Sequence, residues 1–317
     1  MSNETTLASQ RFGLRRLSNW GRWGADDERG TANFITPAVI TQAGAEVKRG
    51  AVFFCGVPMD NAPPTHPGRT GIIHLMPVVN VAAAEVGMKS QGIFNDNLLT
   101  MNVSAATQWD GLVHCGYEGA YYNGVKTAQV SAHRGATRNA VDKLSNSLIT
   151  RGVLADMVAY KGRQAEGHLA AGYAITPDDL NACLRAENVT VRSGDALLVH
   201  TGWTAHWYAN PKERANYFAS QPGMSIKTLE WLDDHEIGCI AVDNTGVEVK
   251  PSEVAGEELP FHLVAIRDLG LTIGEVFDFA ALAKDSRDDR RYTSFFVAPA
   301  QALVGGCNTA PTPVAIK

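Results

Sequence analysis

The chain contains 317 residues, of which 45% are hydrophobic and 19% are charged, a composition typical of a globular protein with a sizeable core. Its formal net charge of -5 gives no electrostatic basis for binding nucleic acid or an anionic membrane surface, so we expect neither as a partner. Five scattered cysteines without a C-x-x-C motif, no secretory signal and no apolar run long enough to span a membrane predict a cytoplasmic protein.

Residues 1–19 are predicted to form an N-terminal arm outside the main domain, either mobile or docked on a partner. Three arginines give this arm a local positive charge. The stretch that follows, Trp20-Gly-Arg-Trp23, places two tryptophans beside glycine. Two interpretations remain open for it: a turn that packs on the core, or an aromatic wall of a pocket in this subunit or a neighbouring one.

The next segments predict a helix, a strand and a long loop. The helix begins with Thr36-Pro37, an N-cap followed by proline at the first position, and we expect it to end near Gly50. An apolar run over 51–55 predicts a short strand. The segment 58–73 is rich in proline and glycine, which predicts a loop of a length that is often functional. This region brings three basic side chains toward whatever it covers: His66, Arg69 and His74.

The segment 97–114 carries the strongest indication of chemistry. As an extended strand it would place its even-numbered side chains on one face, namely Ser104, Gln108, Asp110 and His114. Trp109 would then pack on the opposite side. An amide oxygen, a carboxylate and an imidazole are suitable ligands for a divalent cation. As a helix, the segment would still bring Asp110 and His114 together, and a purely structural hydrogen bond between them is the alternative interpretation.

The second half of the chain alternates apolar runs with helical patterns. Buried strands are predicted over 151–157, 194–200 and 237–242, with helices over 176–187 and 225–235. His200 lies inside one of these strands, where a hydrogen-bonded core histidine is the favoured interpretation. The alternation predicts an α/β protein, and the lack of a long linker predicts one domain over residues 20–317.

Two further candidate ligands come from the last third of the chain. His262 follows Pro260-Phe261 at a predicted helix start, and Glu275 follows Ile273-Gly274 before another helical pattern. The chain has no G-x-S-x-G, Walker A, G-x-G-x-x-G or H-E-x-x-H motif. A metal site built on the segment 97–114 would therefore have to recruit distant ligands such as these two.

The stretch S-A-A-T-Q-W-D-G-L-V-H, residues 104–114, resembles the signature H-x-G-T-H-x-D-x-P-x-H of the cyclase-type metal-dependent hydrolases, the family of bacterial kynurenine formamidase and isatin hydrolase. Thr107, Asp110 and His114 match, whereas Ser104 and Gln108 replace two histidines, and leucine replaces the proline. Three further stretches resemble family motifs: W-G-x-D-D-x-x-G-T-x-N, G-D-x-x-L-x-x-T-G-W and P-F-H-L-V-A-I-R-D-L-G-L-T-I-G-E.

The resemblance implies a swivelling β/β/α fold, an α/β domain with a mixed sheet and flanking helices, assembled as a homodimer or homotetramer. It also implies one divalent cation per chain, Zn²⁺ or Mn²⁺, because two signature histidines are replaced. The implied metal ligands are Gln108, Asp110, His114, His262 and Glu275. Gln108 has the alternative of hydrogen-bonding a bound water, and His114 and Glu275 are the catalytic candidates. The candidate substrate-binding residues are Trp23, His74, Ser104, Thr107, Tyr121 and Trp203.

By the same resemblance, the chain would hydrolyse an amide bond of an aryl formamide, cyclic imide or lactam, or a lactone, in a small aromatic or cyclic substrate. A cation-activated water would attack the carbonyl. Two alternatives stay open. Ser104 and Gln108 motivate a catalytically altered, metal-free ligand-binding relative, and the same site would also serve a metal-dependent isomerase or cyclase.

Overall fold

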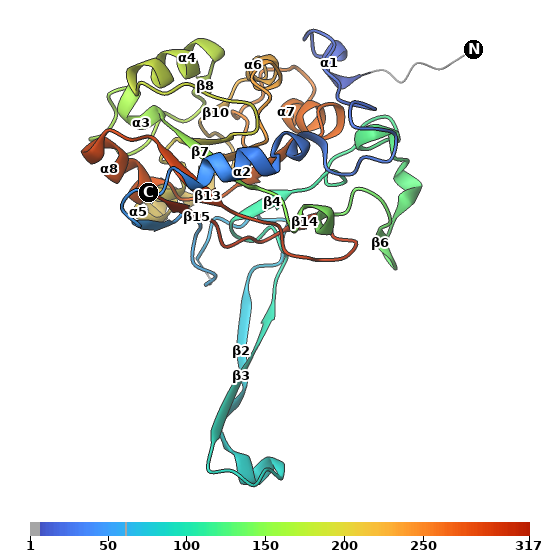
Figure 1. Cartoon of the computed structure of the whole chain (residues 1–317), viewed down its shortest axis with the longest axis vertical. Helices are drawn as coiled ribbons and strands as arrows, with labels where there is room; N and C mark the ends of the chain where they lie inside the picture. Colours follow the sequence, from blue (N-terminus) through green and yellow to red (C-terminus); the bar gives the residue numbers. More distant parts are fainter. Residues whose placement is uncertain (1–6, 61) are drawn as a thin grey trace.

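The computed structural model describes residues 7–60 and 62–317, and a curled mixed sheet dominates it (Figure 1). Within these residues the sheet has nine strands, in the order β1-β15-β13-β7-β9-β11-β12-β4-β14. The central strands β7, β9, β11 and β12 are parallel, whereas the outer strands pair antiparallel. The bounds in chain order are β1 Val52–Phe54, β4 Gln108–Asp110, β7 Ile149–Asp156, β9 Ala196–His200, β11 Cys239–Val242, β12 Thr272–Glu275, β13 Thr293–Val297, β14 Asn308–Thr309 and β15 Val314–Ile316.

Helices cover both faces of this sheet because its parallel strands are apolar on both sides. Side chains alternate along each strand, so Leu197 of β9 faces one core cluster and Leu198 faces the other. Helices α4 and α6 supply apolar side chains to the first cluster, and α2 and α8 supply the second. The helix bounds are α1 Ala8–Arg11, α2 Pro37–Gly44, α3 Met157–Tyr160, α4 Pro177–Ala186, α5 Trp203–Ala209, α6 Thr228–Asp234, α7 Pro260–His262 and α8 Ala280–Asp289.

Local sequence determines where the longer helices begin. Thr36 caps α2 by accepting a hydrogen bond from the Val39 backbone N–H at 3.3 Å, and Thr176 caps α4 in the same way. The end of α2 was predicted wrongly near Gly50. The helix stops earlier because the chain turns back to the sheet, where the Ala51 N–H donates to the Lys317 carbonyl at 3.1 Å.

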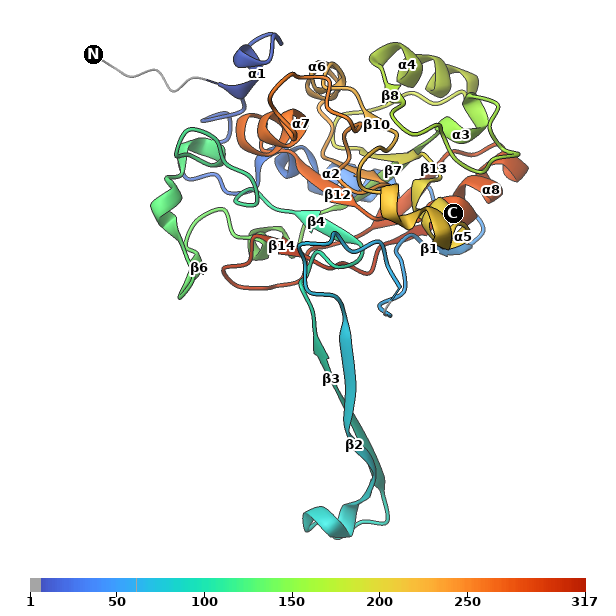
Figure 2. The ribbon, with the colours of Figure 1, turned by 180° about the vertical axis from the view of Figure 1, so that it is seen from behind.

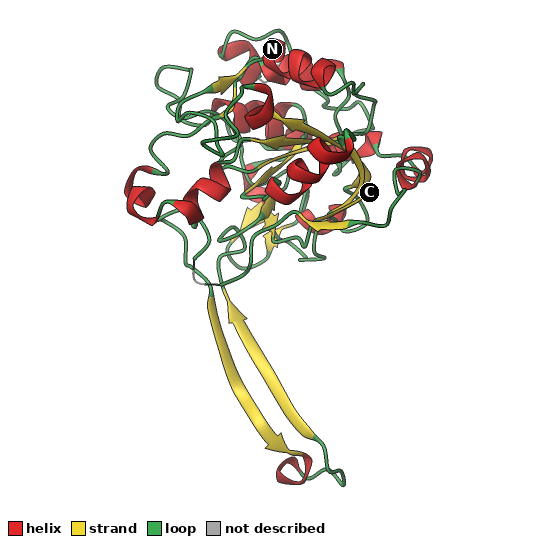
Figure 3. Cartoon of the chain, turned by 90° about the vertical axis from the view of Figure 1, so that its left-hand side faces the viewer, coloured by secondary structure: helices red, strands yellow, loops and turns green. Residues whose placement is uncertain are grey.

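A long hairpin projects from the body of the protein (Figure 3). It consists of β2 (Ile73–Ala82) and β3 (Ile93–Thr100), which pair antiparallel and are joined through the short helix η2 (Ala83–Val86). The predicted single extended segment 97–114 is therefore divided, because β3 returns along the hairpin whereas β4 lies in the main sheet. We refer to residues 73–100 as the projecting hairpin.

Shorter elements fill the remaining connections. Two small sheets pair β5 (Val130–Ser131) with β6 (Gly135–Ala136) and β8 (Ala174–Ile175) with β10 (Gly223–Met224). The other short helices are η1 Gly30–Phe34, η3 Tyr122–Gly124, η4 Thr127–Gln129, η5 Val141–Leu144, η6 Pro211–Asn216 and the π-helix η7 Leu263–Asp268. The predicted α/β class, with a mixed sheet and flanking helices, is confirmed (Figure 2).

The described part of the predicted N-terminal arm, residues 7–19, lies against η7. The Ser9 backbone N–H donates to Asp268 Oδ2 at 2.9 Å, and Leu17 is fully buried. Residues 1–6 of the predicted arm lie outside the described residues. None of the helices within residues 7–60 and 62–317 has the length and apolar character needed to cross a membrane.

Candidate metal centre

The candidate centre lies where β4 joins the parallel part of the sheet. β4 runs antiparallel to β12, and Gln108 pairs directly with Glu275. Trp109 points to the opposite face of β4, where its ring centroid lies 5.0 Å from that of Phe277 in the core. The strand alternation predicted for this stretch therefore holds at its centre, and it leaves Gln108, Asp110 and Glu275 buried together.

His262 reaches the same place from α7. Its Nε2 lies 3.1 Å from Glu275 Oε1 and 3.8 Å from Asp110 Oδ2. Its Nδ1 lies 2.5 Å from Glu248 Oε1, and the backbone N–H groups of Phe261 and His262 also donate to the Glu248 carboxylate. Glu248 therefore holds the start of α7 and directs the Nε2 atom of His262 toward the two other carboxylates, as carboxylates commonly do for metal-binding histidines.

Asp110, His262 and Glu275 fit a divalent cation. One ligand atom from each of these three buried residues lies within 4.8 Å of the others. Asp110 Oδ2 is buried and has no hydrogen-bond partner among the described residues. A buried carboxylate oxygen without a partner is costly, and a cation would satisfy it. Imidazole and carboxylate ligands suit Zn²⁺ and Mn²⁺ alike.

The charges in the centre perturb one another strongly. Burial raises the pKa of Asp110, although His114 and His262 oppose this rise. Burial acts in the opposite direction on His262, but hydrogen bonds to Glu248 and Glu275 hold the pKa of its imidazole well above the ordinary value. The protonated imidazole of His262 thus offsets part of the negative charge of the carboxylates around it.

Gln108 contacts the centre through its amide nitrogen. Its Nε2 donates to Asp110 Oδ1 and to Glu275 Oε2, both at 3.0 Å, and its Oε1 accepts from Arg69 Nη1 at 3.1 Å. The partners determine this orientation, because carboxylates only accept hydrogen bonds and a guanidinium only donates them. Gln108 therefore positions the two carboxylates, and its predicted role as a metal ligand through Oε1 remains a prediction.

His114 lies in the turn that follows β4, not on a continuous strand as predicted. Its Nε2 is 3.8 Å from Asp110 Oδ2, and its Nδ1 is 2.9 Å from Asn308 Nδ2. Asn308 Nδ2 also donates to Ser104 Oγ at 2.7 Å and lies 3.3 Å from Asp110 Oδ1. Because Asn308 Nδ2 is a donor, neutral His114 carries its proton on Nε2.

The other candidate residues of the central stretch hold its backbone in place. Thr107 Oγ1 donates to the Val276 carbonyl at 2.7 Å and accepts from the Val57 N–H at 2.8 Å. Ser104 receives the hydrogen bond from Asn308. Both hydroxyls are buried and used by the protein itself, so the structure places them beside the centre as supports.

The remaining candidate substrate-binding residues lie elsewhere. Trp23 packs against Phe34, with ring centroids 5.0 Å apart, and Trp203 stacks on Tyr217 at 5.2 Å. Tyr121 packs on a small cluster that contains Val113, and His74 lies on β2 of the projecting hairpin. None of Trp23, His74, Tyr121 and Trp203 borders the cavity described next. His200 is a core histidine, as favoured from the sequence, with Nδ1 2.9 Å from Asp156 Oδ1.

A cavity of about 210 Å³ opens beside the centre. It is lined by Pro64, His66, Arg69, His114, Thr245, Gly246, Lys250, Leu259, His262, Glu275 and Val276. The sequence indicated His66 and Arg69 only as residues of a covering loop. It carried no signal for Lys250, Glu248 or Asn308, because no motif or spacing connects them with the central stretch.

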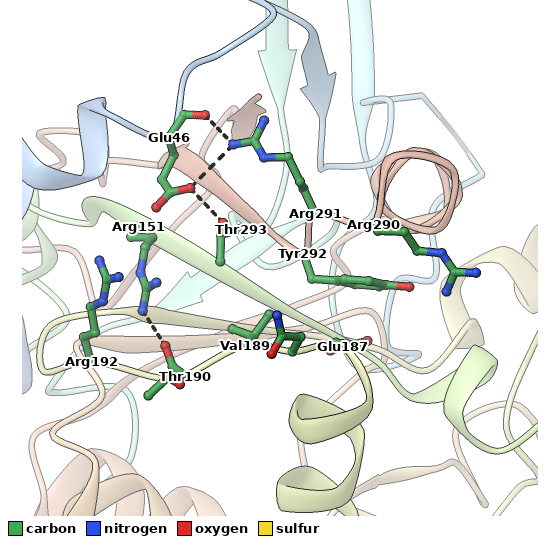
Figure 4. Close-up of a pocket in the computed structure, with 11 residues that line it drawn as sticks. Glu46, Arg151, Glu187, Val189, Thr190, Arg192, Arg290, Arg291, Tyr292 and Thr293 are labelled. Carbon is green, nitrogen blue, oxygen red and sulfur yellow. Dashed lines mark hydrogen bonds and ion pairs between the residues drawn. The ribbon is translucent and has the colours of Figure 1, made fainter.

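A second cavity of about 340 Å³ lies away from the centre (Figure 4). Two of its arginines are paired within the protein: Arg151 with Asp195 at 2.5 Å, and Arg291 with Glu46 at 3.6 Å. It contains no cluster of candidate metal ligands among the described residues. We therefore assign the chemistry to the smaller cavity.

Comparisons with known proteins agree with this fold. The sequence model of the family described as "Putative cyclase" matches residues 55–249. The crystal structure of a novel cyclase is 35% identical, with a TM-score of 0.87, over 95% of this chain and 98% of that chain. No curated protein matches.

More distant solved structures share the fold. Isatin hydrolase A from Ralstonia solanacearum is 15% identical, with a TM-score of 0.59, over 89% of this chain and 98% of that chain. An isatin hydrolase bound to the product analogue thioisatinate is also 15% identical, with a TM-score of 0.57, over 88% and 97%. The family match covers more than half of the chain, which confirms the predicted resemblance. The chain belongs to the cyclase family.

Proposed function

We propose that this chain is a metal-dependent hydrolase that cleaves an amide or lactone bond of a small substrate. The observation that carries this proposal is the convergence of Asp110, His262 and Glu275 beside a cavity, with Asp110 Oδ2 left without a hydrogen-bond partner among the described residues. The likeness in fold to isatin hydrolases supports it. A divalent cation, Zn²⁺ or Mn²⁺, would polarise the substrate carbonyl and lower the pKa of water.

His114 is the residue best placed to move a proton. Its side chain is 25% exposed and borders the cavity, whereas Glu275 is buried and both of its oxygens accept hydrogen bonds. In its protonated form, His114 would donate its Nε2 proton to the leaving nitrogen or oxygen. The proton released by the attacking water would then return His114 to the protonated form, so the protons balance over one turnover.

Two other residues of the centre orient the proposed metal ligands. Gln108 holds Asp110 and Glu275 in place, and Glu248 orients His262. The cavity of about 210 Å³ is smaller than the roughly 300–1,000 Å³ of sites for drug-sized ligands. This size favours a substrate with one ring, such as an aryl formamide or a small cyclic imide, lactam or lactone. The buried Asp110 Oδ2 atom has no hydrogen-bond partner among the described residues, which argues against the metal-free alternative.

The test combines metal analysis with turnover. We expect the purified chain to hold about one divalent cation and to hydrolyse formanilide or a simple lactone, and to lose both properties in His262→Ala. His133→Ala removes an exposed histidine of a loop and is the matched control. If His262→Ala folds and retains full metal content and turnover, the proposed centre is wrong.

We also propose that the protein works in the cytoplasm. All five cysteines are free in the structure, and three of them are buried. This pattern supports a reducing compartment. Measurement of free thiols in protein taken directly from cells tests the proposal, because extensive disulfide formation in that sample would contradict it.

A further inference from the structure

Two cationic side chains border the cavity without a carboxylate partner. Arg69 comes from the loop before the projecting hairpin, and Lys250 follows the turn after β11. Arg69 Nη1 donates to the Ser104 carbonyl at 3.0 Å and to Gln108 Oε1 at 3.1 Å. Within residues 7–60 and 62–317, neither Arg69 nor Lys250 forms an ion pair, and the Lys250 ammonium has no hydrogen-bond acceptor. Both side chains are half-buried.

The formal charge of the cavity depends on whether a divalent cation is bound. Without metal, the carboxylates of Asp110, Glu248 and Glu275 are balanced by Arg69, Lys250 and the protonated imidazole of His262. A divalent cation in place of the His262 proton would leave the cavity with a net positive charge. Burial lowers the pKa of His66, and the nearby charges of Arg69 and Lys250 lower it further.

We propose that Arg69 and Lys250 form a carboxylate-binding subsite, so that the substrate carries a carboxylate in addition to its scissile bond. This inference rests on the proposed hydrolase function. The guanidinium of Arg69 keeps Nε and Nη2 available for an oxygen acceptor, and an arginine fork suits a planar carboxylate. Pro64, Leu259 and Val276 supply an apolar wall of the same cavity for the body of a ring.

The experiment compares benzoate with benzamide, which differ in charge but have nearly the same shape. Binding of each to zinc-loaded protein is measured by titration calorimetry, without any turnover. We expect benzoate to bind about tenfold more tightly than benzamide, and Lys250→Met to remove this preference while the metal content stays unchanged. Lys126→Met, which removes an exposed lysine outside the cavity, is the matched control.

The possible outcomes distinguish failure of the proposed subsite from failure of the proposed hydrolase function. If benzoate binds Lys250→Met as tightly as it binds the wild type, its carboxylate binds the zinc ion instead of Lys250, and the subsite is refuted. If benzoate binds the wild type no better than benzamide, the subsite is refuted as well. Failure of the proposed function would appear elsewhere, as a chain without metal and without activity on formanilide. A matched pair of substrates, 4-formamidobenzoate and formanilide, extends the test to KM, which we expect Lys250→Met to raise only for the former.

Discussion

Glu248 offers the sharpest test of how the metal centre is organised. Its carboxylate accepts hydrogen bonds from the backbone N–H groups of Phe261 and His262, at 3.0 and 3.2 Å, and faces His262 Nδ1 at 2.5 Å. It therefore keeps a proton of His262 on Nδ1, so that Nε2 is the atom that would bind a cation. Glu248→Gln keeps one acceptor oxygen, whereas Glu248→Ala removes every contact.

The expected losses follow from these contacts. Loss of a residue that orients a metal ligand typically weakens metal binding by about 10- to 100-fold. We expect about tenfold, or about 1.4 kcal/mol, for Glu248→Gln and about 100-fold for Glu248→Ala. Competition with a chromogenic zinc chelator measures the dissociation constant, and thermal melting identifies any unfolding.

A second glutamate provides the control. Glu253 also accepts a hydroxyl and a backbone N–H, from Ser225 and Ile226, but it lies outside the centre. Glu253→Gln should lower stability to a similar extent without changing zinc affinity. Unchanged zinc affinity in a folded Glu248→Ala, or an equal loss in Glu253→Gln, would refute the role of Glu248.

Three further predictions follow from the structure. Trp109→Ala should lower the free energy of unfolding by about 3–5 kcal/mol, because the ring is fully buried; denaturant titration measures this, and a loss below 1 kcal/mol would contradict the core position. His114→Ala should keep its metal but lose about 10²- to 10⁴-fold in turnover, and loss of the metal instead would make His114 a ligand. Burial raises the pKa of Glu187 to about 8, so the folded state retains a proton that the unfolded state releases between pH 5 and pH 8, and this residue lowers stability as pH rises. Between pH 5 and pH 8, Glu187→Gln should become more stable relative to the wild type, by at most about 1.4 kcal/mol per pH unit. If the difference in stability between the variant and the wild type is the same at pH 5 and at pH 8 in thermal melting, the Glu187 carboxyl does not titrate in this range.

Much of the fold was predictable because its causes are local. Threonine followed by proline marks the starts of α2 and α4, and apolar runs mark β7, β9 and β11. At β4, alternation alone separates Trp109 from Gln108 and Asp110. The family resemblance added His262 and Glu275, which motif spacing could not connect with Asp110 on its own.

The projecting hairpin was not predictable from the same patterns. Its apolar residues lie on both faces, so they lack the alternation that marks a half-buried strand. The sequence therefore indicated an apolar run without showing that it leaves the body. Only the pairing of β2 with β3 decides this, and that pairing depends on contacts between distant residues.

The sequence by itself determined the residue types of the centre, since a carboxylate, an imidazole and an amide lie within one short stretch. The tertiary structure decided their roles. Gln108 donates to carboxylates because Arg69 occupies its oxygen, and His114 is set by Asn308, which enters from the end of the chain. The orientation of a hydrogen-bonding side chain depends on which partners surround it, and here those partners come from segments far apart in the sequence.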